Sequence, residues 1–201
     1  EIRISKYETN SKSPNQKVET SDQYLEVFTT RPDTLFGATF MVVSPEHPLI
    51  LNIEYGISNI DEVKDYIDKA KKKTDLERSD EKKEKTGVKI EGITAINPAN
   101  NAEIPIFVAD YVMMGYGTGA IMAVPAHDDR DFAFAKKYHI PVKEVVQSDL
   151  SNPSNLTNVS NWTNRAYEGE GRSVNSGFLD GLMTSEAKQK MVEWLEEKKI
   201  G

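Results

Sequence analysis

The sequence predicts an α+β fold in which a β-barrel-like core of mixed strands is surrounded by peripheral helices. Three observations support this class. Apolar runs rich in β-branched and aromatic residues alternate with segments whose apolar residues recur at helical spacing. The 201 residues, 38% of them hydrophobic, are enough to bury one core. No internal repeat is visible. We therefore expect a single domain over residues 1–201.

Several segments are expected to form strands because they combine high β propensity with flanking turn residues. They are residues 23–30, 38–44, 88–96, 104–109, 120–124 and 142–146. The first two flank a polar loop at residues 29–34, and the strand at 120–124 leads into a second polar loop. These two loops carry most of the functional argument.

The longest helical pattern covers residues 58–78. Its apolar stripe consists of Ile60, Val63, Ile67 and Ala70, and the rest of its surface is charged. The run SDEKKEKT at residues 79–86 predicts an exposed turn or a frayed helix end.

Two further helices are expected towards the end of the chain. Residues 128–139 begin at Asp128 as the N-cap and bury Phe132 and Ala135. Residues 184–199 form an amphipathic helix capped by Thr184 or Ser185, with Met191, Trp194 and Leu195 towards the core. Between these helices, residues 148–164 are poor in charge and rich in Asn and Ser, which predicts a loop.

Charge and cysteine content exclude several classes of protein. The chain has no cysteine, which excludes a disulfide scaffold and a cysteine zinc site and favours a reducing compartment. The net charge of −7 disfavours a protein that wraps duplex nucleic acid, because such affinity needs many Lys and Arg contacts with phosphates. A protein that grips a single nucleotide end remains compatible with it. No apolar stretch approaches the length of a transmembrane helix, so no membrane partner is expected.

Two polar loops share one pattern, in which a strand-like apolar run ends in hydroxyl, glycine, proline and carboxylate residues. They are TTRPDT at residues 29–34 and GTGAIMAVPAHDDRD at residues 117–131. Loops at strand ends are where rigid scaffolds usually present functional groups. If the two loops faced each other, Thr hydroxyls would line one wall of a pocket and an Asp carboxylate the other. Such a pocket suits a cationic amine beside a hydrolysable bond.

The first loop allows two interpretations. Thr29 and Thr30 could pack as ordinary strand residues, or their hydroxyls could position a water or a ribose hydroxyl. Arg31 and Asp33 could form a simple turn around Pro32, or Arg31 could reach a phosphate or carboxylate through its planar fork. Thr34 could shape a side-chain pocket by bulk alone.

The second loop also has a structural interpretation. If Asp128 is the N-cap, Asp129 and Asp131 lie in the first turn, where acidic side chains complement the helix dipole. Only three histidines occur, and none stands in a metal-binding spacing, so we expect no metal site. The glycines at residues 115–119 lack the spacing of a nucleotide loop and indicate a tight strand connection.

Three long segments resemble the editing insertion of leucyl-tRNA synthetase, of the bacterial or organellar type. They are TTRPDTLFGATFMVVSPEHPLI, INPANNAEIPIFVADYVMMGYGTGAIMAVPAHDDRDFAFAKKY and EGEGRSVNSGFLDGL. Valyl and isoleucyl enzymes carry similar insertions, but the continuations DTLFG and AVPAHDDRD favour the leucyl branch. No HIGH or KMSKS motif occurs, so the chain resembles an insertion excised from a larger synthetase.

The resemblance implies the class I synthetase editing-domain fold and an aminoacyl-tRNA ester hydrolase. Its substrate would be mischarged tRNA-Leu carrying norvaline, isoleucine or methionine, and leucyl-tRNA would be spared. A second pocket of this kind is needed because one methyl group discriminates by only about 1–3 kcal/mol, a limit for which synthetase editing is itself the standard illustration. The alternatives are a tRNA 3′-end binding module that is inactive in isolation, and a valyl- or isoleucyl-type editing domain.

The resemblance also implies roles for individual residues. Asp131 would pair with the α-ammonium group, and Thr34 would be the steric gate against leucine. The full expected set is Thr29, Thr30, Arg31 and Asp131 as catalytic residues, and Thr34, Tyr116, Met122, Val124, His127 and Asp128 as substrate-binding residues. Thr29, Thr30 and Arg31 would line the ester and the terminal ribose, Met122 and Val124 would form apolar walls, and Tyr116 would lie near the adenosine.

No side chain stands out as a general base, so we expect a water held by Thr and ribose hydroxyls. No cofactor is expected, because water is the co-substrate and ATP and Mg²⁺ would serve only the aminoacylation core of the parent enzyme. The expected partners are the 3′-terminal adenosine of aminoacyl-tRNA-Leu and the rest of the parent synthetase. We expect a monomer in the cytoplasm or in an organelle.

Overall fold

A computed structural model of the chain describes residues 2–6, 23–52, 57–80, 83–115, 117–148 and 165–201. By its internal contacts the chain forms two units. Unit 1 comprises Glu1–Phe28, Met41–Asp80 and Thr86–Ile121, and unit 2 comprises Thr29–Phe40, Glu81–Lys85 and Met122–Gly201. The boundaries fall within two strands, Phe40–Val43 (β3) and Ala120–Ala123 (β6). Both polar loops therefore lie mainly in unit 2.

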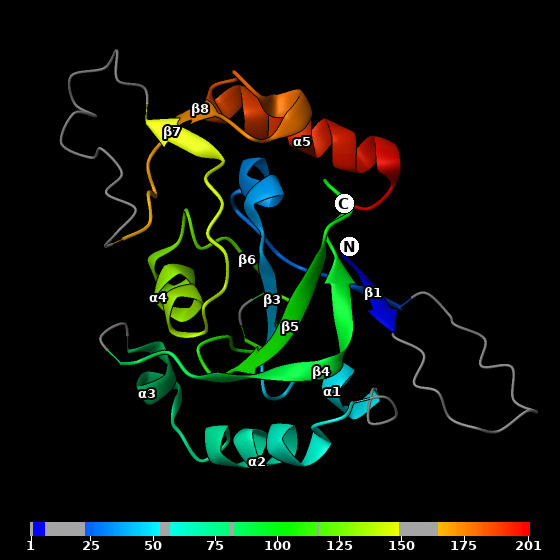
Figure 1. Ribbon diagram of the computed structural model, residues 1–201, viewed down its shortest axis with the longest axis vertical. Helices are drawn as coiled ribbons and strands as arrows, with labels where there is room; N and C mark the ends of the chain where they lie inside the picture. Colours follow the sequence, from blue (N-terminus) through cyan, green and yellow to red (C-terminus); the bar gives the residue numbers. More distant parts are fainter. Residues whose placement is uncertain (1, 7–22, 53–56, 81–82, 116, 149–164) are drawn as a thin grey trace, which may run out of the picture. The chain divides into compact units, whose positions relative to one another are not determined.

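Within the described residues, the main sheet has six strands in the order β2-β1-β4-β5-β3-β6 (Figure 1). The other four strands are Ile2–Lys6 (β1), Gln23–Leu25 (β2), Gly87–Ile96 (β4) and Glu103–Ala109 (β5). β4 pairs antiparallel with β1 and β5, whereas β3 runs parallel to β5. A mixed sheet with peripheral helices confirms the predicted α+β class.

The sheet is open, and β2 and β6 are its two end strands. The hydroxyl of Thr118, just before β6, donates to the carbonyl of Glu26, just after β2, at 2.7 Å. One side-chain hydrogen bond thus joins these two segments where a closed barrel would have a backbone ladder. The predicted barrel-like curl is realised as an open sheet, and the strand predicted for residues 23–30 ends at Leu25.

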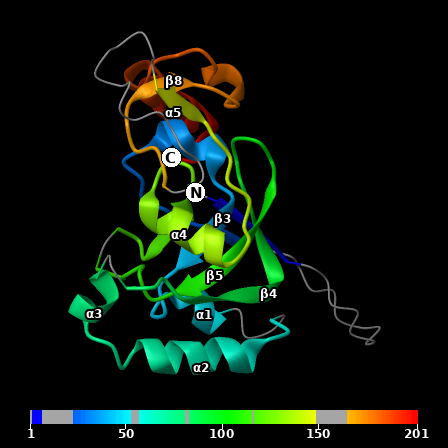
Figure 2. The ribbon, with the colours of Figure 1, turned by 60° about the vertical axis from the view of Figure 1, so that its left-hand side comes forward.

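The predicted helix over residues 58–78 is two helices, Ile60–Ala70 (α2) and Asp75–Ser79 (α3). Thr74 begins a new helix because its hydroxyl accepts the Glu77 N–H and the Glu77 carboxylate accepts the Thr74 N–H. The predicted apolar stripe is largely confirmed, because Val63, Ile67 and Ala70 are buried. α2 lies alongside β4 (Figures 1 and 2). A short helix at Pro48–Asn52 (α1) was not predicted.

Unit 2 is built around Asp129–Lys137 (α4) and Thr184–Lys198 (α5). α4 buries Phe134, whose ring stacks on Phe40 with centroids 5.3 Å apart. α5 packs on the 3-10 helix Pro32–Gly37 (η1), on Gly171–Ser173 (β8) and on the 3-10 helix Gly177–Leu179 (η3). β8 pairs antiparallel with Val146–Ser148 (β7) in a second, two-stranded sheet.

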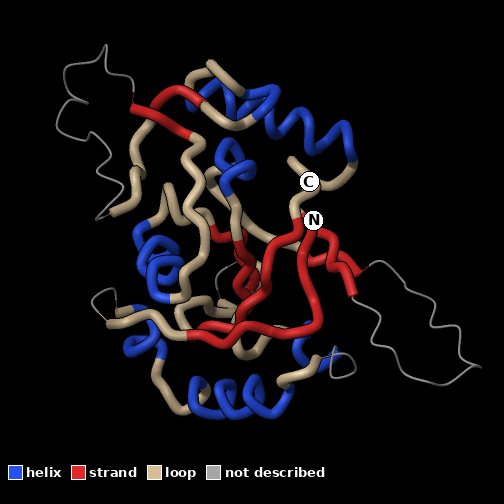
Figure 3. Tube along the Cα trace, viewed as in Figure 1, coloured by secondary structure: helices blue, strands red, loops and turns tan. Residues whose placement is uncertain are grey.

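One predicted boundary and one predicted cap in unit 2 are wrong for physical reasons. The strand expected at 142–146 begins only at Val146, because the N–H groups of Val145 and Val146 first donate to the His127 ring, and the preceding segment runs as a loop (Figure 3). The predicted start of α5 at Thr184 is confirmed, but the N-cap is Met183, because the Thr184 hydroxyl is bonded to the backbone of Gly171 and does not cap the helix. The loop predicted at residues 148–164 lies outside the described residues except for Ser148. Among the described residues, no helix is long and apolar enough to cross a membrane.

The Phe40–Phe134 stack should carry much of the stability of unit 2. We expect Phe134→Ala to lower the free energy of unfolding by about 3–5 kcal/mol, because a fully buried ring is removed and a cavity remains. Urea unfolding followed by circular dichroism measures the change. Val192→Ala, at a half-exposed site on α5 in the same unit, is the control and should change the free energy by less than about 0.5 kcal/mol. An equal loss in both variants would contradict the proposed packing role.

Candidate active site

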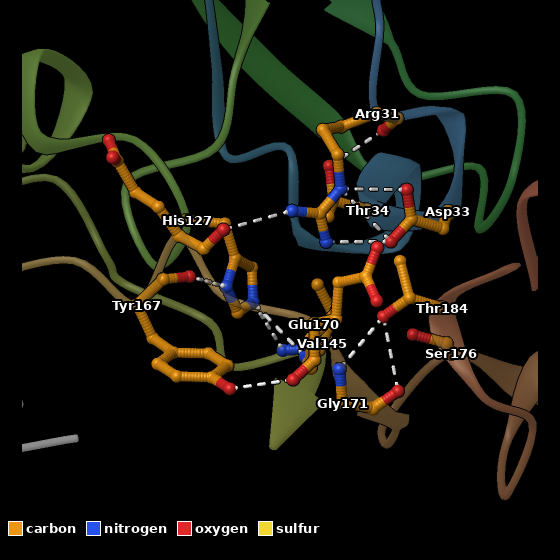
Figure 4. Close-up of polar contacts among 12 residues, drawn as sticks. Arg31, Asp33, Thr34, His127, Val145, Tyr167, Glu170, Gly171, Ser176 and Thr184 are labelled. Carbon is orange, nitrogen blue, oxygen red and sulfur yellow. Dashed lines mark hydrogen bonds and ion pairs between the residues drawn. The ribbon is translucent and has the colours of Figure 1, made fainter. Parts of the chain in front are cut away.

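The first polar loop is ordered by an ion pair between Arg31 and Asp33. The Arg31 guanidinium donates from Nε to Asp33 Oδ1 at 3.0 Å and from Nη2 to Oδ2 at 2.8 Å (Figure 4). Asp33 is completely buried, and Arg31 is partly exposed. Pro32, with its fixed φ, starts η1 between them and keeps the two side chains on a short loop. The fork of Arg31 is therefore already used within the protein.

The threonines of this loop lie in different environments. Thr34 is buried, and its hydroxyl donates to the Arg31 carbonyl at 2.9 Å, which fixes its side-chain rotamer. The Thr29 hydroxyl accepts the Arg31 N–H at 3.0 Å and is half-buried. Thr30 is exposed. A hydroxyl is therefore present at each predicted position, but those of Thr29 and Thr34 also stabilise the turn through hydrogen bonds to the backbone of Arg31.

The second loop leads into α4 as predicted. Asp128 is the N-cap, and its carboxylate accepts the N–H groups of Arg130 and Asp131. Burial opposes its charged form, but the Arg130 guanidinium and these N–H groups outweigh it and lower the pKa of Asp128. Asp131, the third residue of α4, is buried, and its Oδ2 accepts the Val124 N–H at 2.9 Å. This bond connects the helix to the residue that follows β6.

His127 is a buried connector within unit 2. Its Nε2 accepts the N–H groups of Val145 and Val146, each at 3.1 Å, so the proton must be on Nδ1, which donates to the Tyr167 carbonyl at 2.8 Å (Figure 4). Burial is the main cause that lowers the pKa of His127 to about 4. The imidazole is therefore neutral at pH 7. Because both ring nitrogens bond to backbone groups, His127 holds the second loop, residues 145–146 and residue 167 together.

Residues 166–168 connect the two loops. Glu168 begins the third segment that resembles the editing insertion, but sequence reasoning assigned no role to these three residues. The Tyr167 N–H donates to the Ala126 carbonyl, and the Ala166 N–H donates to the Asp129 carboxylate, both at 2.8 Å. The Glu168 carboxylate accepts the Asp129 N–H at 3.1 Å, and its carbonyl lies 3.4 Å from Arg31 Nη1. We call residues 166–168 the strap. Its role could not be predicted from the sequence, because most of its bonds use backbone atoms.

The apolar residues of the second loop lie close to the end of η1. Val124 and Met122 are both buried. A Cβ placed on Gly37, at the end of η1, would lie 3.2 Å from Val124 Cγ1 and 2.7 Å from Val145 Cγ2. Only a glycine permits this approach of η1 to the second loop. Tyr116 lies outside the described residues.

A polar groove of about 900 Å³ lies beside the N-terminal turn of α4. Its lining includes Asp128, Asp129, Arg130, Lys136, Lys137 and Glu168. Among the residues with described positions, no group of three His, Asp or Glu side chains could hold a metal ion. The chemistry that the two polar loops offer in unit 2 is thus a set of hydroxyls, the guanidinium groups of Arg31 and Arg130, and the buried carboxylates of Asp33 and Asp131.

Comparison with known proteins identifies the family. The family described as leucyl-tRNA synthetase, editing domain, matches residues 13–196. The chain belongs to the leucyl-tRNA synthetase editing domains. This confirms the resemblance seen in the sequence.

Two curated relatives of the editing domain are leucine–tRNA ligases. The one from Alkaliphilus oremlandii is 47% identical over 203 residues, which is 100% of this chain and 24% of that protein. The one from Rubrobacter xylanophilus is 51% identical over 178 residues, which is 87% of this chain and 20% of that protein. The chain thus spans a quarter or less of the length of these relatives.

A solved structure shares the fold. It is the LeuRS of Agrobacterium radiobacter K84 in a ternary complex with tRNA and LeuAMS. It is 29% identical with a TM-score of 0.65, and the match covers 98% of this chain and 18% of that one.

The neutral His127 should make the stability of this editing domain depend on pH. The unfolded side chain titrates near 6.5 and the folded one at about 4, so between these values the unfolded state binds more protons. Stability is therefore lost as the pH falls from about 6.5 towards 4, by up to about 3 kcal/mol at 1.36 kcal/mol per pKa unit. Urea unfolding across this range measures the slope.

His127→Gln should flatten this pH dependence, whatever its effect on stability at neutral pH. His47→Gln is the control. Burial lowers the pKa of His47 in the same direction, but His47 is only half-buried and should contribute less. An unchanged pH slope in His127→Gln would contradict the assignment.

Proposed function

We propose that this chain hydrolyses the ester that joins a wrong amino acid to the 3′-terminal adenosine of tRNA-Leu. The wrong amino acids are norvaline, isoleucine and methionine, and leucyl-tRNA-Leu is spared. Membership of the editing-domain family supports an editing role. The observation that carries the proposal is that the TTRPDT loop and the Asp131 turn belong to the same unit and are joined through the strap.

Asp131 supplies the contact for the α-ammonium group in this proposal. Its carboxylate is buried, and an ammonium ion placed against it would find a charge partner with little competition from water. The Val124 N–H fixes one oxygen of this carboxylate, so its orientation is set before substrate binds. A fixed anion of this kind favours an ester whose acyl group carries an α-ammonium group over an ester whose acyl group carries no charge.

The first loop supplies the contacts for the ester and the ribose. Thr29, Thr30 and Arg31 line the reacting bond and the terminal ribose, and a water held by Thr and ribose hydroxyls is the nucleophile. N–H and O–H donors stabilise the oxyanion that develops on the ester carbonyl. No protein side chain acts as the general base, and water is the only co-substrate. Met122 and Val124 form apolar walls.

The sequence predicts that His127 and Asp128 bind substrate, and both also have positioning contacts. His127 holds the second loop against residues 145–146 and the strap, and Asp128 caps α4 so that Asp131 stays in place.

Thr34 excludes leucine by its bulk. Its hydroxyl is bonded to the Arg31 carbonyl, so the side chain has a fixed shape and cannot rotate away from an incoming branch. One methyl group of steric conflict is worth about 1–3 kcal/mol, which is the scale of discrimination that a second pocket requires.

Replacement of the buried carboxylate tests the proposed reaction. We expect Asp131→Asn to reduce hydrolysis of norvalyl-tRNA-Leu by at least about a hundredfold, the scale expected for loss of a buried charge contact of several kcal/mol. The Asn oxygen can still accept the Val124 N–H, so the fold should persist. Deacylation of radiolabelled norvalyl-tRNA-Leu measures the rate. Asp65→Asn removes the same charge from an exposed site on α2 and should keep wild-type activity. Full activity of Asp131→Asn would rule out the ammonium contact.

Two substitutions at Thr34 separate bulk from hydrogen bonding. Thr34→Ala should allow hydrolysis of leucyl-tRNA-Leu, because the methyl that conflicts with the leucine side chain is lost. Thr34→Val keeps the bulk and removes only the hydroxyl, so leucine should stay protected. The rates of leucyl-tRNA-Leu deacylation by the two variants decide the matter. Protection that is lost equally in both would assign the selectivity to the hydroxyl.

A further inference from the structure

We propose that Asp33 and Glu168 are positioning residues for Arg31. Held in this way, Arg31 donates single N–H groups to neutral substrate oxygens and does not bind a phosphate in bidentate fashion. This inference rests on the proposed function, because it states how one residue of the editing site is oriented. It assigns to Asp33 and to the strap roles that the family match does not state.

The donors of Arg31 can be counted. A guanidinium has five N–H groups. Nε–H and one Nη2–H point at the two oxygens of Asp33, and one Nη1–H points at the Glu168 carbonyl. Two N–H groups remain, one on each terminal nitrogen. Asp33 therefore occupies the Nε–H/Nη2–H edge, through which a guanidinium can bind a phosphate or carboxylate in bidentate fashion.

The charge of Arg31 is also balanced. Asp33 is fully buried, and a buried carboxylate is stable only with a hydrogen-bonded partner of opposite charge. Arg31 supplies both the charge and two donors, so the pair is neutral as a whole. A phosphate that approached the guanidinium would also meet the field of Asp33. Ribose hydroxyls and an ester carbonyl carry no net charge and suit the remaining N–H groups better.

The strap links Arg31 to the helix that carries Asp131. The Glu168 carbonyl accepts from Arg31, while the Glu168 carboxylate accepts the Asp129 N–H at the start of α4. The Ala166 N–H returns a bond to the Asp129 carboxylate. The guanidinium and the first turn of α4 are thus both bonded to the strap, the former through Glu168 and the latter through Ala166 and Glu168. This arrangement fixes the donor relative to Asp131.

Two measurements on the 201-residue chain test the proposal. The first uses NMR of the arginine Nε–H groups and does not depend on activity. A positioned Arg31 should give a resolved Nε–H signal with slowed exchange, assigned by its absence in Arg31→Lys. Asp33→Asn should remove this protection. Fast exchange of the Arg31 Nε–H in the wild-type chain would overturn the positioning role even if the chain hydrolyses its substrate.

The second measurement is a double-mutant cycle on norvalyl-tRNA-Leu hydrolysis. Asp33→Asn should lower kcat about tenfold to a hundredfold, the cost of a misplaced contact group. In an Arg31→Lys background the same change should have little further effect, because it acts through Arg31. Additive losses would overturn the proposal. A wild-type chain that is inactive would refute the proposed function instead, and the NMR result would still decide the positioning role.

Glu168 provides a variant that should not disturb folding, because its side chain is exposed. Glu168→Ala should lower kcat at least about threefold, which corresponds to about 0.65 kcal/mol of activation free energy at 1.36 kcal/mol per factor of ten. Glu168→Gln retains an acceptor for the Asp129 N–H and should restore wild-type kcat. Equal kcat for Glu168→Ala and the wild-type chain would rule out a positioning role for Glu168.

Discussion

A carboxylate that leaves water must find hydrogen-bond donors, and this requirement sets the geometry of unit 2. Asp33 and Asp131 are both buried, and each obtains donors in a different way. Asp33 takes the guanidinium fork of Arg31, which closes the first loop on itself. Asp131 takes a backbone N–H from Val124, which ties α4 to the end of β6. Without these bonds, each charge would cost several kcal/mol.

The rest of the site follows from the need to satisfy backbone groups. The first turn of a helix leaves N–H groups without partners. Asp128 accepts two of those in α4, and Glu168 accepts the one of Asp129. A neutral His127 serves as acceptor on one side and donor on the other, which holds residues 145–146 and 167 against the second loop. Polar side chains that sequence patterns assign to catalysis here also maintain the shape of the site.

The sequence predicts the parts of this protein that depend on local patterns. The α+β class, the α2 stripe and Asp128 as the N-cap of α4 follow from periodicity and capping rules, and the structure confirms them. The family follows from long motifs. Contacts made by backbone atoms across long separations could not be predicted, and the strap and the late start of β7 are of this kind. The ion pair between Asp33 and Arg31 could have been predicted, since an acidic residue two positions after an arginine in a tight turn can pair with that arginine.

We propose that this chain alone contains an editing pocket that distinguishes norvaline from leucine. The most direct test is a side-by-side deacylation of norvalyl-tRNA-Leu and leucyl-tRNA-Leu by the purified 201-residue chain at high enzyme concentration. The account predicts rapid loss of norvaline while leucine is retained. Retention of both amino acids, or equal loss of both, would contradict it.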